Sequence, residues 1–398
     1  MDSRRFGRFC MLFVFALSLC YIGHKGIFFA YAEKENSSLA DSGVSTLVQD
    51  QLTGQSAIIN ASGEFIVPFT ADNLQLFQIG SAVFCIQRGD DTGRQTYALC
   101  DAYRMLTDFD FMYIQTTYAG DYPILATDSD CQNGFIDTCG QWIVPPAFYY
   151  AEPFSEGVAL VQTEDSLGYI NPQGEYVLKY TYDELTTAVS FSEGVAAVEY
   201  KTGLWGYIDV HGERIINDYY ADANSFSCGF ARVSDGAGYY FVDHHGNTLG
   251  DTRFSYASDF LYGYAIVGNE SRQRGIVSTT GELVFPIEAD SIINITPDHF
   301  CWIQSDDSTL YGLYNLSTAS FVCSDKYEMP FPFEEGFVWN EEGFIVKKNG
   351  LFGYLSKQGS LLLPCQYAFL GMSEEGTLLG LLEENHRYQY FQAEKHYN

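Results

Sequence analysis

The stretch FSEGVAAVEYKTGLWGYIDVHGE, residues 191–213, decides the fold. Two apolar runs flank a short polar turn, and a second turn, Asp209-Val-His-Gly212, closes the stretch. An Asp that opens such a turn bonds the turn backbone, and a Gly in fourth place accepts a positive φ. The stretch therefore predicts two antiparallel strands that lead into a hairpin turn, with Asp209 and Gly212 shaping that turn.

The same turn recurs along the chain, with Asp, Asn or Ser first and Gly fourth. The copies are at residues 60–63, 137–140, 171–174, 209–212, 243–246, 278–281 and 356–359. A strand that starts at or near a Gly precedes most of them, and a second apolar stretch, often closed by Pro, follows each one. We predict that the recurring positions shape the repeat and carry no chemistry. They are Gly134, Gly168, Trp205, Gly206, Asp209, Gly212, Asp243, Gly246 and Gly353.

A Phe-x-x-Gly element sets the period of the repeat. It starts at Phe77, Phe154, Phe191, Phe226, Phe260 and Phe333. Four successive copies are separated by 37, 35 and 34 residues, and the two longer steps leave room for degenerate copies near Tyr118 and Phe300. The pattern predicts about nine units over residues 44–398, with residues 340–349 as a loop insertion between them.

The fold class predicted is all-β, a tandem array of antiparallel units with three or four short strands each. Aromatic residues make up 16% of the chain and charged residues only 18%, which favours pleated sheet over helix or disorder. One unit cannot cover both faces of its sheet, so stability has to come from stacked neighbours. Two arrangements satisfy this requirement: an open β-solenoid or superhelical array, and radial blades as in a β-propeller.

Residues 1–32 have the parts of a secretory signal. Three arginines precede an apolar run, and Ala30-Tyr31-Ala32 forms a small-x-small cleavage site. We expect either a cleaved signal peptide or an N-terminal membrane anchor, followed by a short polar linker over residues 33–43. The expected location is therefore secreted or extracytoplasmic, in the cell envelope.

The charge balance limits the partners. The net charge is −30, from 21 Lys+Arg against 51 Asp+Glu, so a phosphate backbone is repelled and nucleic-acid binding is disfavoured. Eight cysteines lie beyond the leader, too few for a disulfide scaffold in so long a chain. Without a C-x-x-C motif a structural zinc site is not expected, and Cys131 with Cys139 is the one local pair considered for a disulfide.

The stretch that ends in Trp205-Gly206-Tyr-Ile-Asp209 resembles the WG-repeat family of bacterial tandem β repeats. Their units read roughly F-x-E-G-x-A-x-V, then W-G-Y-I-D-x-x-G, then an apolar strand ending in Pro. The other copies depart at the Trp position, which holds Asn133, Leu167 or Tyr239 in three of them. The resemblance implies repeat architecture and at most a binding role, with no catalytic residues or cofactors to carry over.

The polar residues that suggest chemistry occupy fixed repeat positions. Glu156, Glu193, Glu335 and Glu375 stand beside Gly in separate units, whereas glycoside hydrolysis needs two carboxylates in one cleft. The turn histidines His211, His244 and His245 lack the convergence of a metal site. Asp306-Asp307 and Asp128-Ser-Asp130 are interpreted as acidic loop tips, and Asp128-Ser-Asp130 lacks the Gly and distant Glu of a full calcium loop.

The sequence thus predicts a non-catalytic exported scaffold for a protein or cell-envelope partner. An alternative is a carbohydrate-binding module that uses exposed aromatics on a cell-surface polysaccharide, and a glycosidase or lyase is a further alternative. Trp142, Trp205, Trp302 and Trp339 are interpreted as packing between units, because ringed residues at repeating positions usually fill cores.

Overall fold

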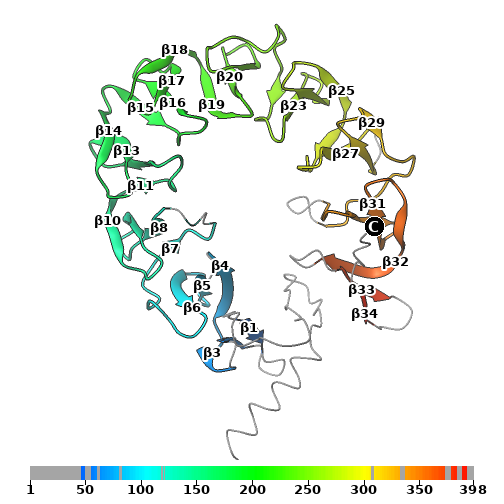
Figure 1. The fold of residues 1–398 in the computed structure, drawn as a ribbon, viewed down its shortest axis with the longest axis horizontal. Coiled ribbons are helices and arrows are strands. Elements are labelled where there is room, and N and C mark those ends of the chain that lie inside the picture. Colours follow the sequence, from blue (N-terminus) through cyan, green and yellow to red (C-terminus); the bar gives the residue numbers. More distant parts are fainter. Residues whose placement is uncertain are drawn as a thin grey trace, which may run out of the picture. The chain divides into compact units, whose positions relative to one another are not determined.

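A computed structural model describes residues 46–49, 55–60, 63–79, 83–117, 120, 122–305, 309–331, 337–372, 378–382 and 388–391. All of its regular elements are strands (Figure 1). No helix among the described residues is long and apolar enough to cross a membrane. The chain divides into two compact units, 1–194 with 198–201 and 210–213, and 195–197 with 202–209 and 214–398.

The strands pair into small sheets that follow one another along the chain. The first five sheets are β1 (Thr46–Gln49), β2 (Ser56–Ile59) and β3 (Phe65–Thr70); β4 (Asn73–Gln78), β5 (Val83–Gly89) and β6 (Gln95–Asp101); β7 (Tyr113–Ile114), β8 (Ile124–Thr127), β9 (Asn133–Ile136) and β10 (Trp142–Phe148); β11 (Tyr150–Ala151), β12 (Ala159–Gln162), β13 (Ser166–Ile170) and β14 (Tyr176–Thr181); and β15 (Leu185–Ala188), β16 (Val195–Tyr200), β17 (Trp205–Asp209) and β18 (Arg214–Tyr220).

The remaining sheets continue the same order. They are β19 (Asp222–Ser227), β20 (Phe230–Ser234) and β21 (Tyr239–Val242); β22 (Tyr256–Ala257), β23 (Tyr264–Gly268), β24 (Arg274–Ser278) and β25 (Leu283–Ala289); β26 (Ser291–Ile293), β27 (Phe300–Gln304), β28 (Tyr311–Asn315) and β29 (Ser320–Phe321); and β30 (Gly343–Lys348), β31 (Leu351–Ser356), β32 (Leu361–Met372), β33 (Leu378–Leu382) and β34 (Tyr388–Phe391).

The predicted fold class is confirmed. Nine sheets occur among the described residues, each an antiparallel meander. Eight of them have three or four strands, and one of these eight lies around the degenerate copy at Phe300. The last sheet differs, since β33 and β34 follow the long β32 and make it a five-stranded sheet. The division into units passes through the sheet β15–β18.

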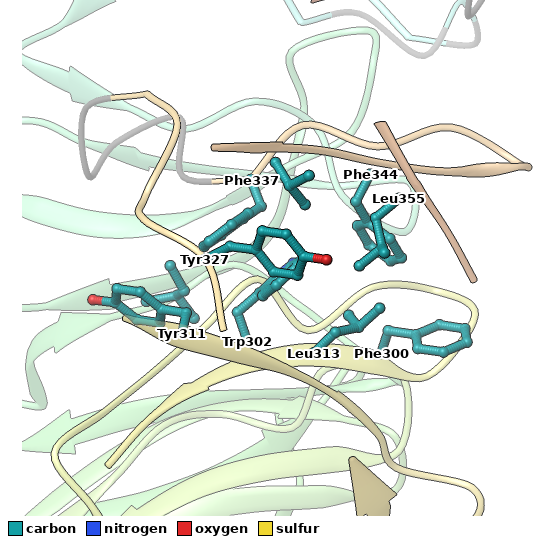
Figure 2. Close-up of a cluster of buried hydrophobic side chains, with 10 residues drawn as sticks. Phe300, Trp302, Tyr311, Leu313, Tyr327, Phe337, Phe344 and Leu355 are labelled. Atoms are coloured by element: carbon teal, nitrogen blue, oxygen red, sulfur yellow. The ribbon is translucent and has the colours of Figure 1, made fainter. Parts of the chain in front are cut away.

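The hydrophobic core lies between successive sheets. The second and third strands of a sheet are buried on both faces, as β12 and β13 illustrate. In the first unit, Leu125 and Phe135 of one sheet pack with Val161 and Ile170 of the next. In the second unit, Trp302 belongs to the cluster that β27 and β28 form with β30 and β31 (Figure 2). Each sheet thus depends on its neighbour for burial, as the repeat pattern implies.

Six of the seven Asp/Asn/Ser-x-x-Gly turns lead directly into a strand, here named the exit strand, whose place in the sheet explains the recurring proline. The exit strands are β3, β10, β14, β18, β25 and β32, and all except β32 are sheet edges. Pro lacks the N–H that a central strand donates, so it is tolerated at an edge, where it also discourages pairing with another chain. Pro68, Pro145 and Pro286 lie on such edges, and β14 carries Lys179 in that place.

One expectation from the sequence is wrong, and several others concern residues that the structure does not describe. Residues 340–349 are not a loop insertion: Gly343–Lys348 is the strand β30, preceded by a turn in which Asn340 N–H bonds the Gly343 carbonyl at 3.0 Å. The apolar run 344–346 drives this pairing, and the true strand entry lies a few residues beyond the Phe-x-x-Gly at Phe333. The leader 1–32, the linker 33–43, Tyr118 and Phe333 lie outside the described residues.

Candidate functional site

The Asp-x-x-Gly turns are built by their first and fourth residues. Asp137 Oδ1 accepts backbone N–H bonds from Cys139 and Gln141, both at 2.8 Å, and Gly140 has a φ of 81°. Asp243 Oδ1 accepts the equivalent bonds from His245 and Asn247 at 2.8 and 2.9 Å, and Gly246 has a φ of 79°. One oxygen of the carboxylate at this position is therefore engaged with its own turn, which gives the residue a structural role.

The Gly that begins the third strand is required by a close approach of the exit strand. A Cβ on Gly168 would lie 2.3 Å from the Leu178 carbonyl oxygen, and one on Gly134 would lie 2.6 Å from that of Val144. The exit strand β10 carries a register shift opposite Gly134, and β14 carries one beside Gly168, between Tyr169 and Ile170. Gly353 meets the same obstacle, 2.9 Å from the Leu363 carbonyl oxygen. Only Gly fits where another backbone comes so near.

The Phe-Ser-Glu-Gly element forms a two-residue hairpin turn between the first and second strands. Ser155 and Val158 exchange backbone hydrogen bonds at 2.9 and 3.1 Å, and the residues between them, Glu156 and Gly157, have φ values of 53° and 89°. Two successive residues with positive φ define a type I′ turn. Glu193 and Gly194 repeat this conformation with φ values of 55° and 84°. Glu is unusual in the first of these positions, and a compensating interaction is expected.

That compensation is a carboxylate clamp between successive repeats. Glu156 Oε1 accepts the Glu193 N–H at 2.7 Å, and Glu156 Oε2 accepts the Gly194 N–H at 2.9 Å. The preceding Ser155 hydroxyl donates to the Phe191 carbonyl at 2.7 Å. The type I′ turn of one repeat therefore holds the same turn of the next repeat through three hydrogen bonds. Both oxygens of Glu156 are occupied, which disfavours a role as general acid.

The aromatic residue after the third-strand Gly makes a second connection between repeats. Tyr169 packs edge-on against Phe191 with ring centroids 4.7 Å apart, and its hydroxyl donates to the Val189 carbonyl at 2.7 Å. In the second unit Tyr207 repeats this with Phe226, at 5.0 Å, and with the Asn224 carbonyl, at 2.8 Å. The recurring Tyr and Phe are thus partners across the repeat junction, with the buried hydroxyl satisfied.

One known protein family matches the part of the chain in which these contacts recur. The family described as WG containing repeat matches residues 134–165, 168–203 and 205–239. Residues 134–239 are three tandem WG repeats. The resemblance found in the sequence is confirmed over this segment, and the chain is a β-repeat scaffold there. No curated protein matches the chain significantly.

Several solved structures are similar in part. BamB from Moraxella catarrhalis is 12% identical with a TM-score of 0.35, over 66% of this chain and 91% of that one. Hsv2 from Kluyveromyces lactis is also 12% identical, with a TM-score of 0.32, over 60% and 95%. A structure titled as the eukaryotic initiation factor is 10% identical with a TM-score of 0.44, over 87% and 95%. Likeness at this level carries no functional argument for the WG repeats.

The Trp that gives the WG repeat its name is only partly buried here. Trp205 begins β17 opposite Tyr220, and it is half-buried, as are Trp142 and Trp339. The expectation of a fully enclosed core residue at Trp205 is therefore too strong, because its strand position lies near the end of the sheet. Trp302, in a degenerate copy, is the Trp that is completely buried. Gly206 and Ile208 beside Trp205 are buried, Asp209 is half-buried, and Gly212 has a φ of 79°.

The polar residues that suggested chemistry lie apart or are engaged in structure. Within the described residues, no group of three or more His, Cys, Asp or Glu side chains is placed to hold a metal ion. Asp128 Oδ1 caps its own turn through Asp130 N–H and Gln132 N–H, both at 2.9 Å. His244 stacks on Phe226 with ring centroids 4.1 Å apart. Glu335, Glu375, Asp306 and Asp307 lie outside the described residues.

The cysteines between 85 and 365 are free thiols. Cys131 and Cys139 precede and follow the four-residue strand β9, which spans about 13 Å, whereas a disulfide needs Cα atoms within about 7 Å. The pairing considered from the sequence is therefore wrong, because the two residues flank one strand and not one hairpin. Burial raises the pKa of the Cys85 thiol to about 12, as for an inert core residue.

The feature that sequence reasoning missed is a set of exposed apolar side chains that recurs on the exit strands of each unit, here named the apolar edge. Its members are Phe65 and Phe69 on β3, Ile143 on β10, Tyr176 and Val177 on β14, Ile215 and Tyr219 on β18, Leu283 on β25, and Leu361 and Leu362 on β32. Every exit strand contributes at least one of them. Apolar side chains that recur in exposed places on successive exit strands are typical of a binding surface.

Replacing Glu156 by Gln tests the clamp. We expect the free energy of unfolding to fall by about 1 kcal/mol, because a neutral amide offers one acceptor where the carboxylate offers two. Chemical denaturation of the full chain measures this, with Glu175→Gln on the neighbouring turn as the control. An unchanged unfolding midpoint for Glu156→Gln would show that the Glu156 carboxylate does not stabilise the fold.

Proposed function

We propose that the chain is a non-catalytic, exported scaffold that binds a protein or another component of the cell envelope through its apolar edge. The observation that carries the proposal is a difference between the recurring polar residues and the recurring apolar residues. Recurring polar residues such as Asp137, Glu156 and Asp243 are engaged in turns and clamps. Recurring apolar residues on the exit strands remain exposed instead.

The apolar edge suits a partner because its backbone is already ordered. Turns of one repeat lie on the exit strand of the repeat before: a Cβ on Gly174 would touch the Val144 side chain at 3.1 Å, and one on Gly212 would touch Leu178 at 3.0 Å. Exposed residues beside these contacts, among them Ile143 and Val177, are therefore held in a fixed spacing within the first unit. Binding to a preordered surface costs little conformational entropy.

Export is supported by the leader and by the charge. Arg4, Arg5 and Arg8 precede an apolar run and a small-x-small end at Ala32, which is the pattern of a secretory signal. A net charge of −30 keeps an aromatic-rich surface soluble while the apolar edge stays available. N-terminal sequencing of the mature protein decides between a cleaved leader and an anchor.

A photo-crosslinking amino acid placed at Val177 in living cells tests the proposed function. We expect a discrete adduct with one envelope component, and we expect Ile143→Thr in the same molecule to remove it, since that change makes the neighbouring edge polar. Thr92, on an exposed hairpin tip, is the matched control position. Equal adducts at 177 and 92, or none at 177 in cells that hold normal amounts of the protein, would exclude the apolar edge as a binding surface.

The second candidate is a carbohydrate-binding role, and one local observation favours it. The hydroxyls of Tyr149 and Tyr182, which belong to successive repeats, form a hydrogen bond, and Tyr149 remains exposed. Tyr presents such rings to sugar faces and to protein partners alike, so the chemistry around this pair decides between the two.

A further inference from the structure

Three tyrosines from two successive repeats gather in the first unit. Tyr149 lies between β10 and β11, Tyr176 begins β14, and Tyr182 follows β14. The Tyr149 and Tyr182 hydroxyl oxygens are 2.6 Å apart. Burial raises the pKa of Tyr182 to about 12, and the hydrogen bond with Tyr149 and the nearby Tyr176 hydroxyl add to the rise. These three residues are here named the tyrosine cluster.

The cluster is held in place by its polar ends. The Tyr182 hydroxyl donates to the Thr163 carbonyl at 3.0 Å and lies 2.6 Å from the Tyr149 hydroxyl. The Tyr149 hydroxyl also lies 3.0 Å from Gln162 Oε1. Asn133, which stands where the best WG repeat has Trp, donates to the Phe148 and Tyr149 carbonyls at 3.2 and 3.1 Å. Rings fixed in this way lose little freedom when a ligand stacks on them.

Two tyrosines of the cluster are partly exposed. Tyr149 is 49% exposed although its hydroxyl is bonded, and Tyr176 is 36% exposed with Lys179 Nζ 4.6 Å from its ring centroid. An aromatic face with polar groups at its rim suits a pyranose, whose C–H face is apolar and whose hydroxyls point outwards at the edge. A flat protein partner would need a wider apolar area than these rings supply.

The charges around the tyrosine cluster indicate whether it can bind an anionic or a neutral polysaccharide. Glu152, Glu164 and Asp165 lie on the same repeat, and the chain as a whole is strongly acidic. An anionic polysaccharide would be repelled, whereas a neutral one would not. We propose that the tyrosine cluster is a binding subsite for a neutral polysaccharide. The tyrosine cluster shares only Tyr176 with the apolar edge, and its test does not depend on the partner proposed for that edge.

Native affinity electrophoresis of the full chain tests the proposal with two polymers of one backbone. We expect retardation in gels with hydroxyethylcellulose, which is neutral, and much less in gels with anionic carboxymethylcellulose. Tyr149→Ala and Tyr182→Ala should each weaken binding about tenfold, since each removes a stacked ring or its support. Tyr149→Phe keeps the ring and should lose less. Tyr103→Ala is the control, because Tyr103 is 63% exposed in the same unit but outside the cluster.

Several results would overturn the assignment. They are free migration of the folded wild-type chain in hydroxyethylcellulose, stronger retardation in carboxymethylcellulose, or an equal loss with Tyr103→Ala. If an alanine variant does not fold, nitration of the wild-type chain decides the matter. Hydroxyethylcellulose should then protect Tyr149 and Tyr176 and leave Tyr103 reactive, and equal nitration with and without the polymer would contradict the subsite. The crosslink at Val177 reports on the apolar edge separately.

Discussion

Replacing Trp302 by Ala should lower the free energy of unfolding by about 3–5 kcal/mol, the largest effect of any single change considered. Trp302 is fully buried and lies parallel to Phe337, with ring centroids 3.8 Å apart at an angle of 8°. Tyr327 and Phe344 meet its ring edge-to-face, at 6.1 and 5.6 Å (Figure 2). Truncation would leave a cavity between two sheets, and urea denaturation of the full chain measures its cost.

Two matched variants separate packing from other causes. The Trp302 indole N–H has no hydrogen-bond partner in the part of the chain that the structure describes, so Trp302→Phe keeps much of the packing and loses no bond. It should cost about 1–2 kcal/mol. Trp205→Ala should also cost about 1–2 kcal/mol, because half the burial gives roughly half the transfer term. If Trp205→Ala and Trp302→Ala lowered the free energy of unfolding equally, the buried fraction of a Trp side chain would not determine how much it stabilises the fold.

Gly168→Ala should cost about 2–4 kcal/mol, although it adds a single methyl group. The new Cβ would lie 2.3 Å from the Leu178 carbonyl oxygen and 3.1 Å from Lys179 Cα, both backbone atoms that cannot rotate away. The exit strand β14 would have to separate from β13 to make room. Thermal unfolding of the variant measures the loss.

Gly89→Ala is the control for this change. Gly89 also lies in a strand, but its Cβ would meet Asn73 at an ordinary 3.9 Å. Its substitution should be neutral or slightly stabilising, because Ala restricts the unfolded chain. If Gly168→Ala were as harmless as Gly89→Ala, the third-strand Gly would not be explained by the exit strand.

Sequence periodicity was sufficient to predict the sheets. The spacing of Phe154, Phe191 and Phe226 locates the repeat, and the Asp-x-x-Gly turns locate its hairpins, because both are local features of the backbone. The degenerate copy at Phe300 was found by counting periods alone. The strand β30 was missed, because the recurring Phe-x-x-Gly element was sought at Phe333 while pairing depends on the apolar run after Gly343.

Contacts between repeats were beyond the sequence argument. The clamp of Glu156 on Glu193 and Gly194 joins residues 37 and 38 positions apart, and a repeat pattern shows recurrence without showing which copies touch. The depth of Trp205 and the exposure of Tyr149 depend on how neighbouring strands end. The glycines were predicted as structural positions, but the approach of the exit strand over Gly168 needs coordinates to be seen.

The central claim is that recurring motif residues maintain the repeats and leave function to the exposed surface. One repeat of the second unit lacks the clamp naturally, which offers a direct test. Cys228 occupies the position of Glu156, with a φ of 55°, and the turn after it, Tyr262-Gly263, has φ values of 52° and 88°. The Ser227 hydroxyl donates to the Phe260 carbonyl at 2.8 Å, as Ser155 does to Phe191 at 2.7 Å.

Chemical denaturation of Cys228→Glu beside Cys228→Gln and wild type is therefore the decisive measurement. A carboxylate at this position should accept the Tyr262 and Gly263 N–H groups and raise the free energy of unfolding by about 1 kcal/mol, with Gln giving less. Cys228→Glu with stability equal to or below that of Cys228→Gln would contradict the account, because the motif Glu would then have no structural role to explain its recurrence.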